Sequence, residues 1–133
     1  MKLTRASSYA LHAVAFMAVQ KHERPIASHN IAQARGIPER FLLKVLKPLV
    51  SARVLLSIKG PNGGYRLARP ANEITMLEVV EAVDGPIRGH APMGHENPNS
   101  HLNKRLDQIC DTSAEVLRKQ LGKVKLTELA GKD

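Results

Sequence analysis

Residues 36–69 read "GIPERFLLKVLKPLVSARVLLSIKGPNGGYRLAR", and this stretch decides which fold the sequence predicts. Gly36 can adopt the positive φ that ends a helix, and Pro38 suits the first position of a new helix, where its missing N–H has no partner to lose. A helical run follows, then a leucine-rich run at 54–58, a glycine-rich turn at 60–64 and a strand-like run at 65–67. This order predicts a helix followed by a two-stranded hairpin.

The same stretch is strongly basic. Between Arg40 and Asn72 the chain has seven Lys or Arg residues and no Asp or Glu, and the whole chain of 133 residues has a formal net charge of +8. A basic helix and hairpin without interrupting acids attract a phosphate backbone, so we interpret them as a recognition helix and wing. The alternative is a basic protein with no nucleic-acid partner. An aromatic content of 3% disfavours single-strand binding through stacked bases.

Two further helices are expected before this stretch. Residues 4–20 contain no Gly or Pro and read as a largely apolar helix with Thr4 as its N-cap. A short helix with Ser28 as candidate cap then ends at Gly36. Together with the next helix this gives the helix-turn-helix outline, although many other helical hairpins share that outline.

The third helix has an apolar stripe at helical spacing, which consists of Phe41, Leu42, Val45, Leu46 and Leu49. Pro48 lies within the same run. A proline inside a helix removes one backbone hydrogen bond, so we expect the helix to kink or restart there.

The C-terminal half predicts two more helices around a loop. Thr75 and Glu78 form a capping-box pattern, and Asp84-Gly85-Pro86 stops the helix that follows it. Residues 101–121 repeat apolar side chains at spacings of three and four, Gly122 is expected to end this helix, and a short turn follows. The fold class is thus mainly α with a small β-wing. We expect a winged helix-turn-helix domain at 1–86, a flexible loop at 87–100, and a dimerisation helix with a C-terminal turn at 101–133.

A long terminal helix with a narrow apolar stripe suits pairing with a second copy, which would place two recognition helices about 34 Å apart and predict a palindromic site. The alternative is that this helix folds back on its own domain. The residues predicted to pair are Leu102, Leu106, Ile109, Cys110, Ser113, Val116, Leu117 and Leu121.

Several segments resemble the Rrf-two family of bacterial regulators, which includes IscR, NsrR and CymR. They are "MKLTRASSYALHAV", "IAQARGIPERFLLKVLKPL", "SIKGPNGGYRLARPANEITMLEVVEAVDGP" and the closing "LTELA". The resemblance covers most of the chain apart from the loop after Pro86. It implies a winged-helix fold with a long dimerisation helix and double-stranded DNA as the partner.

In such folds the first turns of the recognition helix reach base edges, and Arg40 is our prediction for a base contact, with a phosphate contact as the alternative. Glycines at the hairpin tip would let backbone N–H groups approach phosphates or a minor groove, whereas the plain alternative is a turn exposed to water. The residues predicted to bind DNA are Ser28, His29, Pro38, Glu39, Arg40, Phe41, Lys44, Lys47, Lys59, Gly60, Pro61, Asn62, Gly63, Gly64, Tyr65 and Arg66.

The chain departs from the family in its cysteines. Family members that carry an iron–sulfur cluster have three cysteines in the loop, and the matching positions here fall near Pro92, Pro98 and Lys104. One thiol is too few for an all-cysteine cluster, so we expect no cofactor and read Cys110 as a small packed side chain. His12 is expected to be a hydrogen-bonded core residue. The alternative metal site would draw on His12, His90, His95, His101 and Cys110.

No catalytic constellation is present in the sequence, which predicts that the chain is not an enzyme. A single cysteine, a longest apolar run of only 9–19 and the lack of a leader-type N-terminus favour the cytoplasm over a membrane. The expected function is that of a dimeric, sequence-specific transcriptional regulator acting as a repressor, with an effector that the sequence does not reveal. The alternatives are a metal or redox sensor built on Cys110 and the loop histidines, and a non-specific nucleic-acid or protein interaction module.

Overall fold

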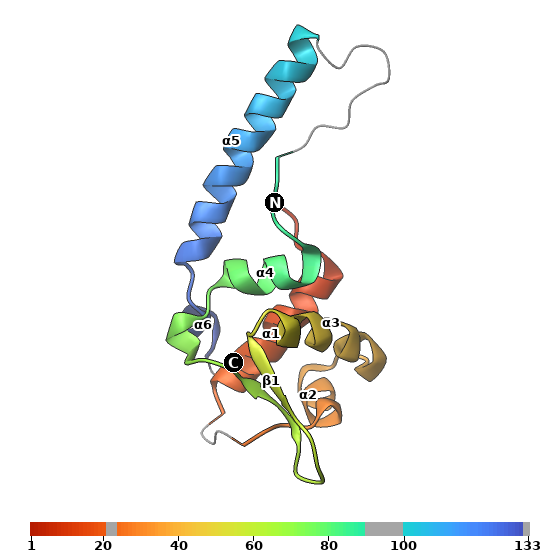
Figure 1. The fold of residues 1–133 in the computed structure, drawn as a ribbon. Coiled ribbons are helices and arrows are strands. Elements are labelled where there is room, and N and C mark those ends of the chain that lie inside the picture. Colours follow the sequence, from red (N-terminus) through yellow and green to blue (C-terminus); the bar gives the residue numbers. More distant parts are fainter. Residues whose placement is uncertain (21–23, 90–99, 132–133) are drawn as a thin grey trace.

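The computed structural model describes residues 1–20, 24–89 and 100–131. A cluster of helices surrounds α1, the hairpin projects from one side, and α5 extends away from the opposite side (Figure 1). The elements are α1 (Arg5–Ala18), α2 (Ser28–Arg35), α3 (Glu39–Ser51), β1 (Leu55–Ile58), β2 (Gly64–Leu67), η1 (Ala71–Glu73), α4 (Met76–Asp84), α5 (His101–Lys123) and α6 (Leu126–Leu129). The predicted fold class is confirmed.

The helix boundaries follow local chemistry with two exceptions. Thr4 caps α1 by accepting a hydrogen bond from the Ser7 amide at 3.0 Å, and Gly36 ends α2 in the left-handed conformation at φ 65°. Ser28 is not the cap of α2, because the N-cap position is Ala27 and the Ser28 hydroxyl points elsewhere. Pro38 is the N-cap of α3 and not its first helical residue.

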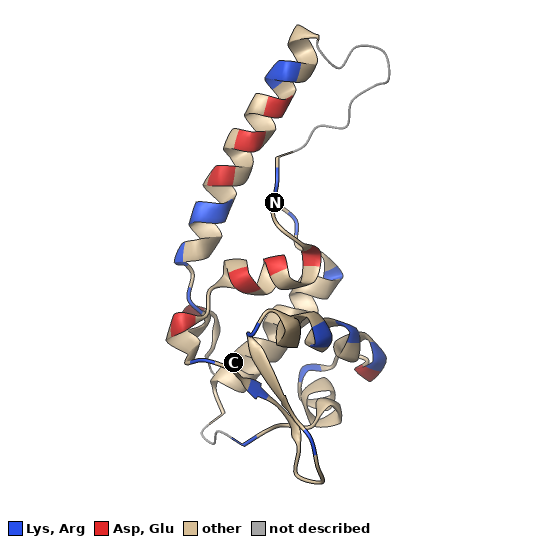
Figure 2. Cartoon of the chain, in the orientation of Figure 1, with Lys and Arg blue, Asp and Glu red and all other residues tan. Residues whose placement is uncertain are grey.

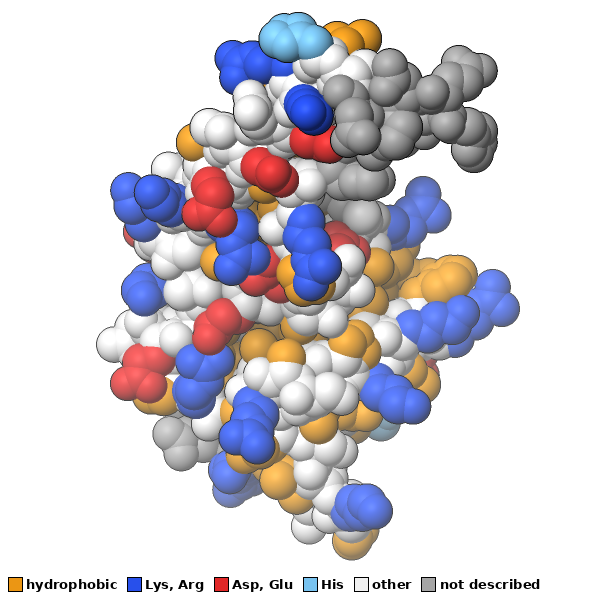
Figure 3. Space-filling view, turned by 45° about the horizontal axis from the view of Figure 1, so that its top comes forward, with side chains coloured by type: hydrophobic (Ala, Val, Ile, Leu, Met, Phe, Trp, Pro, Cys, Tyr) orange, Lys and Arg blue, Asp and Glu red, His pale blue; other side chains and the backbone are white. Residues whose placement is uncertain are grey.

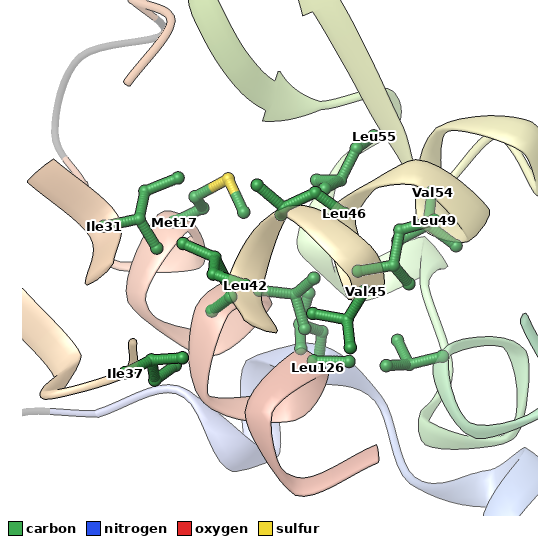
Figure 4. Close-up of a cluster of buried hydrophobic side chains, with 14 of the residues drawn as sticks. Met17, Ile31, Ile37, Leu42, Val45, Leu46, Leu49, Val54, Leu55 and Leu126 are labelled. Atoms are coloured by element: carbon green, nitrogen blue, oxygen red, sulfur yellow. The ribbon is translucent and has the colours of Figure 1, made fainter. Parts of the chain in front are cut away.

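The apolar stripe of α3 supplies the centre of the core. Leu42, Val45, Leu46 and Leu49 are buried and pack with α1 and α2 side chains such as Met17 (Figure 4). Phe41 departs from the predicted stripe, since 37% of it remains exposed. The five apolar positions span a wider angle around the helix axis than the face of α3 that packs on the core.

Pro48 does not interrupt α3. The helix runs from Glu39 to Ser51 with Pro48 inside it, so it does not restart there, while the alternative of a kink stays a prediction. Leu49 directly after the proline is fully buried, and this packing offsets the missing backbone hydrogen bond. The N-terminal turns of α3 are thereby held on the same rigid element as the core.

The hairpin after α3 is docked on the rest of the chain. Its strands are antiparallel, with Leu55 opposite Leu67 and Ile58 opposite Gly64. Ile26, which precedes α2, also pairs with Tyr65 of β2 through two backbone hydrogen bonds of 2.8 and 2.9 Å. A Cβ on Gly64 would lie 2.4 Å from the carbonyl carbon of Ile26. Only glycine therefore allows β2 to approach the 24–27 segment this closely.

The C-terminal turn belongs to the core and not to a separate unit. Leu126 is fully buried among the side chains of the first domain, and its amide donates to the carbonyl of Ile74 at 2.8 Å. The predicted unit 101–133 is therefore divided by the packing, with α6 joining the N-terminal core. Gly122 does not end α5, which continues to Lys123. Within the described residues, none of the helices is both long and apolar enough to cross a bilayer.

Candidate nucleic-acid interface

The outward face of α3 is a basic surface carried on a buried helix. The side chains that point away from the core recur one, four, five and eight positions after Glu39, and all are exposed: Glu39, Arg40, Leu43, Lys44 and Lys47. The Arg40 guanidinium lies 4.9 Å from the centre of the Phe41 ring, and the Lys44 Nζ lies 5.7 Å from it. This stacking orders two long cations at the beginning of the helix.

Leu43 is a candidate for contact with a DNA base that was not predicted from the sequence. It is 43% exposed and lies between the cations of the outward face. The sequence shows it only as one more leucine in the run from Phe41 to Leu46, where it looks like core. An exposed aliphatic side chain at the middle of this face suits contact with a thymine methyl group.

The start of α2 adjoins the start of α3. The Ser28 hydroxyl donates to the Glu39 carboxylate at 3.2 Å, so the two predicted residues lie together. His29 is exposed on the next position. The hydrogen bond orients the single acidic side chain that the described part of this surface contains.

The wing tip presents backbone and one cation to solvent. Lys59, Gly60, Pro61 and Asn62 are exposed, and the turn closes through a 3.0 Å bond from the Gly63 amide to the Gly60 carbonyl. Gly60 has φ 110°, and a Cβ on Gly63 would lie 2.1 Å from the carbonyl oxygen of Ile58. The tip is thus narrow enough to enter a groove, and its shape depends on these two glycines.

Two residues predicted for the tip lie at the root of the wing. Arg66 pairs with Leu56, two positions from the tip end of the ladder, and its Nε is buried. Tyr65 is half-buried against the 24–27 segment. The structure therefore brings together Ser28 of α2 and Glu39 of α3, and it places Tyr65 and Arg66 within the hairpin ladder and not at the exposed turn.

Acidic side chains are unevenly placed along the molecule. Figure 2 shows Lys and Arg with almost no acid on α3 and the hairpin, whereas α4 and α6 carry acids and α5 carries both acids and bases. In the space-filling view the acidic side chains lie over the upper and left part of the face, among basic ones and away from the hairpin (Figure 3). The scarcity of acids favours contact of the α3 and wing face with a polyanion.

The long helix α5 carries two different apolar stripes. Cys110, Leu117 and Leu121 face their own chain, and Leu121 is only 6% exposed. The residues that stay exposed form the second stripe, which we call the outer stripe: Leu102, Leu106, Ile109, Ser113 and Val116. Their spacings of four, three, four and three are those of a coiled-coil seam. The predicted pairing set thus differs in exposure: the outer stripe is exposed, Cys110 and Leu117 are half-buried, and Leu121 is buried. Pairing through this helix stays a prediction.

Residues 81–89 contact the middle of α5. Glu81 of α4 forms an ion pair with Arg118 and accepts the Ile87 amide at 2.8 Å. Gly89 lies directly against the α5 backbone, since a Cβ there would be 2.2 Å from the Asp111 nitrogen. These contacts connect the helical cluster to the middle of α5.

Comparison with known proteins agrees with this geometry. The family model described as "Rrf2: Iron-dependent Transcriptional regulator" matches residues 3–132. The chain belongs to the Rrf2 family. A protein of Mycobacterium tuberculosis (strain H37Rv), named as a candidate HTH-type transcriptional regulator, is 30% identical over 132 residues, which are 98% of this chain and 82% of that protein.

Better-known members are also similar. The transcriptional regulator IscR of Photorhabdus laumondii is 32% identical over 96 residues, or 72% of this chain and 58% of IscR. The structure of CymR, the global cysteine regulator of B. subtilis, superposes with a TM-score of 0.78 at 26% identity, covering 98% of this chain and 96% of CymR. These relatives are transcriptional regulators, so this Rrf2 protein is a regulator and not an enzyme.

Among the described residues, the iron of the family description has no site with three suitable donors. The sequence has one cysteine, Cys110, and no group of three His, Cys, Asp or Glu side chains within the described residues is arranged to hold a metal ion. His101 is nine residues before Cys110 on the same helix, a rise of about 13 Å. His90 and His95 lie outside the described residues.

His12 is not the core residue that the sequence predicted. It is exposed, and its Nδ1 lies 2.9 Å from an Arg35 terminal nitrogen. Because the guanidinium can only donate, Nδ1 is the acceptor in this pair. The expected hydrogen bond is present, and it joins α1 to α2.

Proposed function

We propose that this Rrf2 regulator acts in the cytoplasm as a homodimer that binds a palindromic site in double-stranded DNA and represses transcription there. The observation that supports this most is the surface made by α3 and the wing tip. Arg40, Lys44, Lys47 and Lys59 are all exposed on it, and Glu39 is the sole acid among its described residues. Such a surface matches the shape and charge of a major groove with the flanking minor groove.

The residues divide by the part of the DNA that each suits. Arg40 is in the first turn of α3, where its fork of donors can bind the O6 and N7 atoms of a guanine, and Leu43 can contact a thymine methyl group. Lys44 and Lys47, further along the helix, suit phosphates on either side of the groove. Lys59 at the wing tip suits a narrow minor groove, where the negative potential is strongest.

Pairing through the outer stripe of α5 would give the site its symmetry. Leu102 and Val116 are 65% and 64% exposed in the single chain, which is unusual for apolar residues of a long helix. Burying the seam against a second copy removes this apolar surface from water. A two-fold dimer then presents two α3 helices to successive turns of one duplex.

The test is binding to a duplex selected from a random pool. Charge reversal by Arg40→Glu or Lys59→Glu should weaken binding at least about a hundredfold, because each removes an attraction and adds a repulsion. Lys119→Glu on α5 makes the same change in net charge outside the surface, and it should alter affinity less than about threefold. Equal losses in all three variants, or equal affinity of the wild type for random duplexes, would contradict the proposal.

We propose further that DNA binding needs no iron–sulfur cluster, since one thiolate cannot hold such a cluster. Protein prepared without oxygen and then treated with a chelator should bind the selected duplex with unchanged affinity. Iron or zinc in stoichiometric amounts, together with loss of binding after its removal, would favour the metal-sensor alternative.

A further inference from the structure

A cavity of about 390 Å³ lies between the end of α1 and the root of the wing, outside the α3 surface. The polar residues that line it are Gln20, Arg24, Arg66 and Arg69. Apolar side chains, among them Met17, Ile26 and Leu56, complete the wall. No Asp or Glu is among the described residues that line it. Its size is that of a small-molecule pocket.

One polar atom in this wall lacks a partner. The Nε of Arg66 is buried and has no hydrogen-bond acceptor in the described part of the chain. A buried donor of a charged group without an acceptor is costly, and an anion in the cavity would satisfy it. Arg66 pairs with Leu56 in the hairpin, so cationic and apolar contacts come from one pair of neighbouring residues.

The rest of the wall is already ordered. Arg69 donates to the Glu73 carbonyl and to the Glu78 carboxylate, each at 3.0 Å, and this fixes its guanidinium. The C-terminal end of α1 would by itself repel an anion. Gln20 offsets that effect, because its amide donates to the Phe16 carbonyl at 3.0 Å.

We propose that this cavity binds a small organic anion with an apolar part, such as an aryl or alkyl carboxylate, through Arg66 and Arg24. The proposal has a regulatory part, in which a ligand in this cavity changes the affinity for DNA. That part rests on the proposed DNA binding. The cavity joins Met17 and Gln20 of α1 to Leu56 and Arg66 of the wing. A bound ligand therefore acts on the docking of the wing and, through it, on DNA affinity.

The binding claim is tested without DNA. The full chain, labelled with nitrogen-15, is titrated with sodium phenylacetate and with neutral phenylacetamide, and amide shifts are followed by NMR. Phenylacetate should give saturable amide shifts at Ile26, Leu56, residues 66–69 and Ala71, and phenylacetamide should bind at least about tenfold more weakly. Arg66→Met, which keeps the aliphatic stem, should weaken phenylacetate binding about tenfold, whereas Arg40→Met should not.

Absence of saturable shifts, equal binding of acid and amide, or shifts centred on α3 would each overturn the site. So would a loss of DNA affinity in Arg66→Met as large as that in Arg40→Met, because Arg66 would then be a DNA contact.

Saturating phenylacetate should change the Kd for the selected duplex by about fivefold or more in the wild type and not in Arg66→Met. An unchanged Kd in a protein that binds both ligands would overturn the regulatory part alone. A wild type that binds phenylacetate but no DNA would refute the proposed function and leave the site in place.

Discussion

Arg53 is held in the left-handed conformation at φ 62°, where a Cβ is strained. It is the single described non-glycine residue with positive φ. The turn between α3 and β1 requires this geometry, because Val54 must return its amide to the Leu49 carbonyl at 3.0 Å.

Arg53→Gly should therefore stabilise the fold by about 0.5–1 kcal/mol, the relief of strain exceeding the entropy that glycine adds to the unfolded chain. Urea unfolding followed by circular dichroism measures this difference. Arg53→Ala keeps the Cβ and removes the same charge, so it serves as the control and should show no gain. If alanine stabilised as much as glycine, strain would not be the cause.

Asp84 joins the two ends of the helical cluster. Its carboxylate accepts the Thr4 hydroxyl at 2.9 Å and the Ser7 hydroxyl at 2.5 Å, and Ser7 is fully buried. Sequence patterns placed Thr4 and Asp84 at helix ends but could not show that these ends meet, because the contact spans 80 residues.

Removing the acceptor should cost more than removing the buried donor. Asp84→Ala leaves the Ser7 hydroxyl buried without a partner, a loss of about 1–3 kcal/mol in the free energy of unfolding. Ser7→Ala leaves only a carboxylate that water can reach, and it should cost less than about 1 kcal/mol. Chemical denaturation of the two variants compares them, and the reverse order would argue against the hydrogen bond as the stabilising contact.

At the scale of elements, caps and glycines were predictable while packing partners were not. The capping box of Thr75 and Glu78 is present, with bonds of 2.9 and 3.1 Å, because it depends on residues three apart. By contrast, nothing local indicates that Leu126 enters the core, since a four-residue segment has no periodicity to read. In the sequence the two stripes of α5 read as one set of apolar residues. They are distinguished only when α4 packs against one side of the helix.

The docking of the wing gives an element-scale prediction. Gly64→Ala would place a Cβ 2.4 Å from Ile26, so it should destabilise the fold by about 1–3 kcal/mol and reduce DNA affinity through a displaced wing. Thermal unfolding and DNA titration measure the two effects. The matched variant is Gly122→Ala on α5, whose Cβ would lie 3.7 Å from the Leu77 side chain of α4, an ordinary van der Waals contact. It should stabilise by about 0.5–1 kcal/mol, and a loss as large as that of Gly64→Ala would refute the steric account.

At the scale of the molecule, the side of α3 and the wing carries bases and almost no acids, whereas α5 carries both (Figure 2). The charge count of the stretch from residue 40 to 72 predicted the basic side, because the stretch holds seven cations and no acid. Four of the cations are exposed on the α3 and wing surface: Arg40, Lys44, Lys47 and Lys59. The sequence did not show that Arg66 lies apart from the residues of the wing tip. Its place in the cavity wall depends on the hairpin docking against residues 24–27.

The proposed dimer should dissociate when a charge is placed in the outer stripe of α5. Ile109→Glu on the outer stripe should convert the dimer to a monomer in sedimentation, because it brings two carboxylates together in an apolar interface. Thr112→Glu changes an exposed position of the same helix outside the outer stripe and should leave the dimer intact. A dimer in both variants would show that the seam lies elsewhere.

The most direct test of the central claim, that paired α3-and-wing surfaces bind one duplex, is a hydroxyl-radical footprint on the selected site. The account predicts two protected patches related by two-fold symmetry, with centres about 10 base pairs apart or a multiple of that spacing, and loss of both in Arg40→Glu. A single patch, or a footprint that survives Arg40→Glu unchanged, would contradict it.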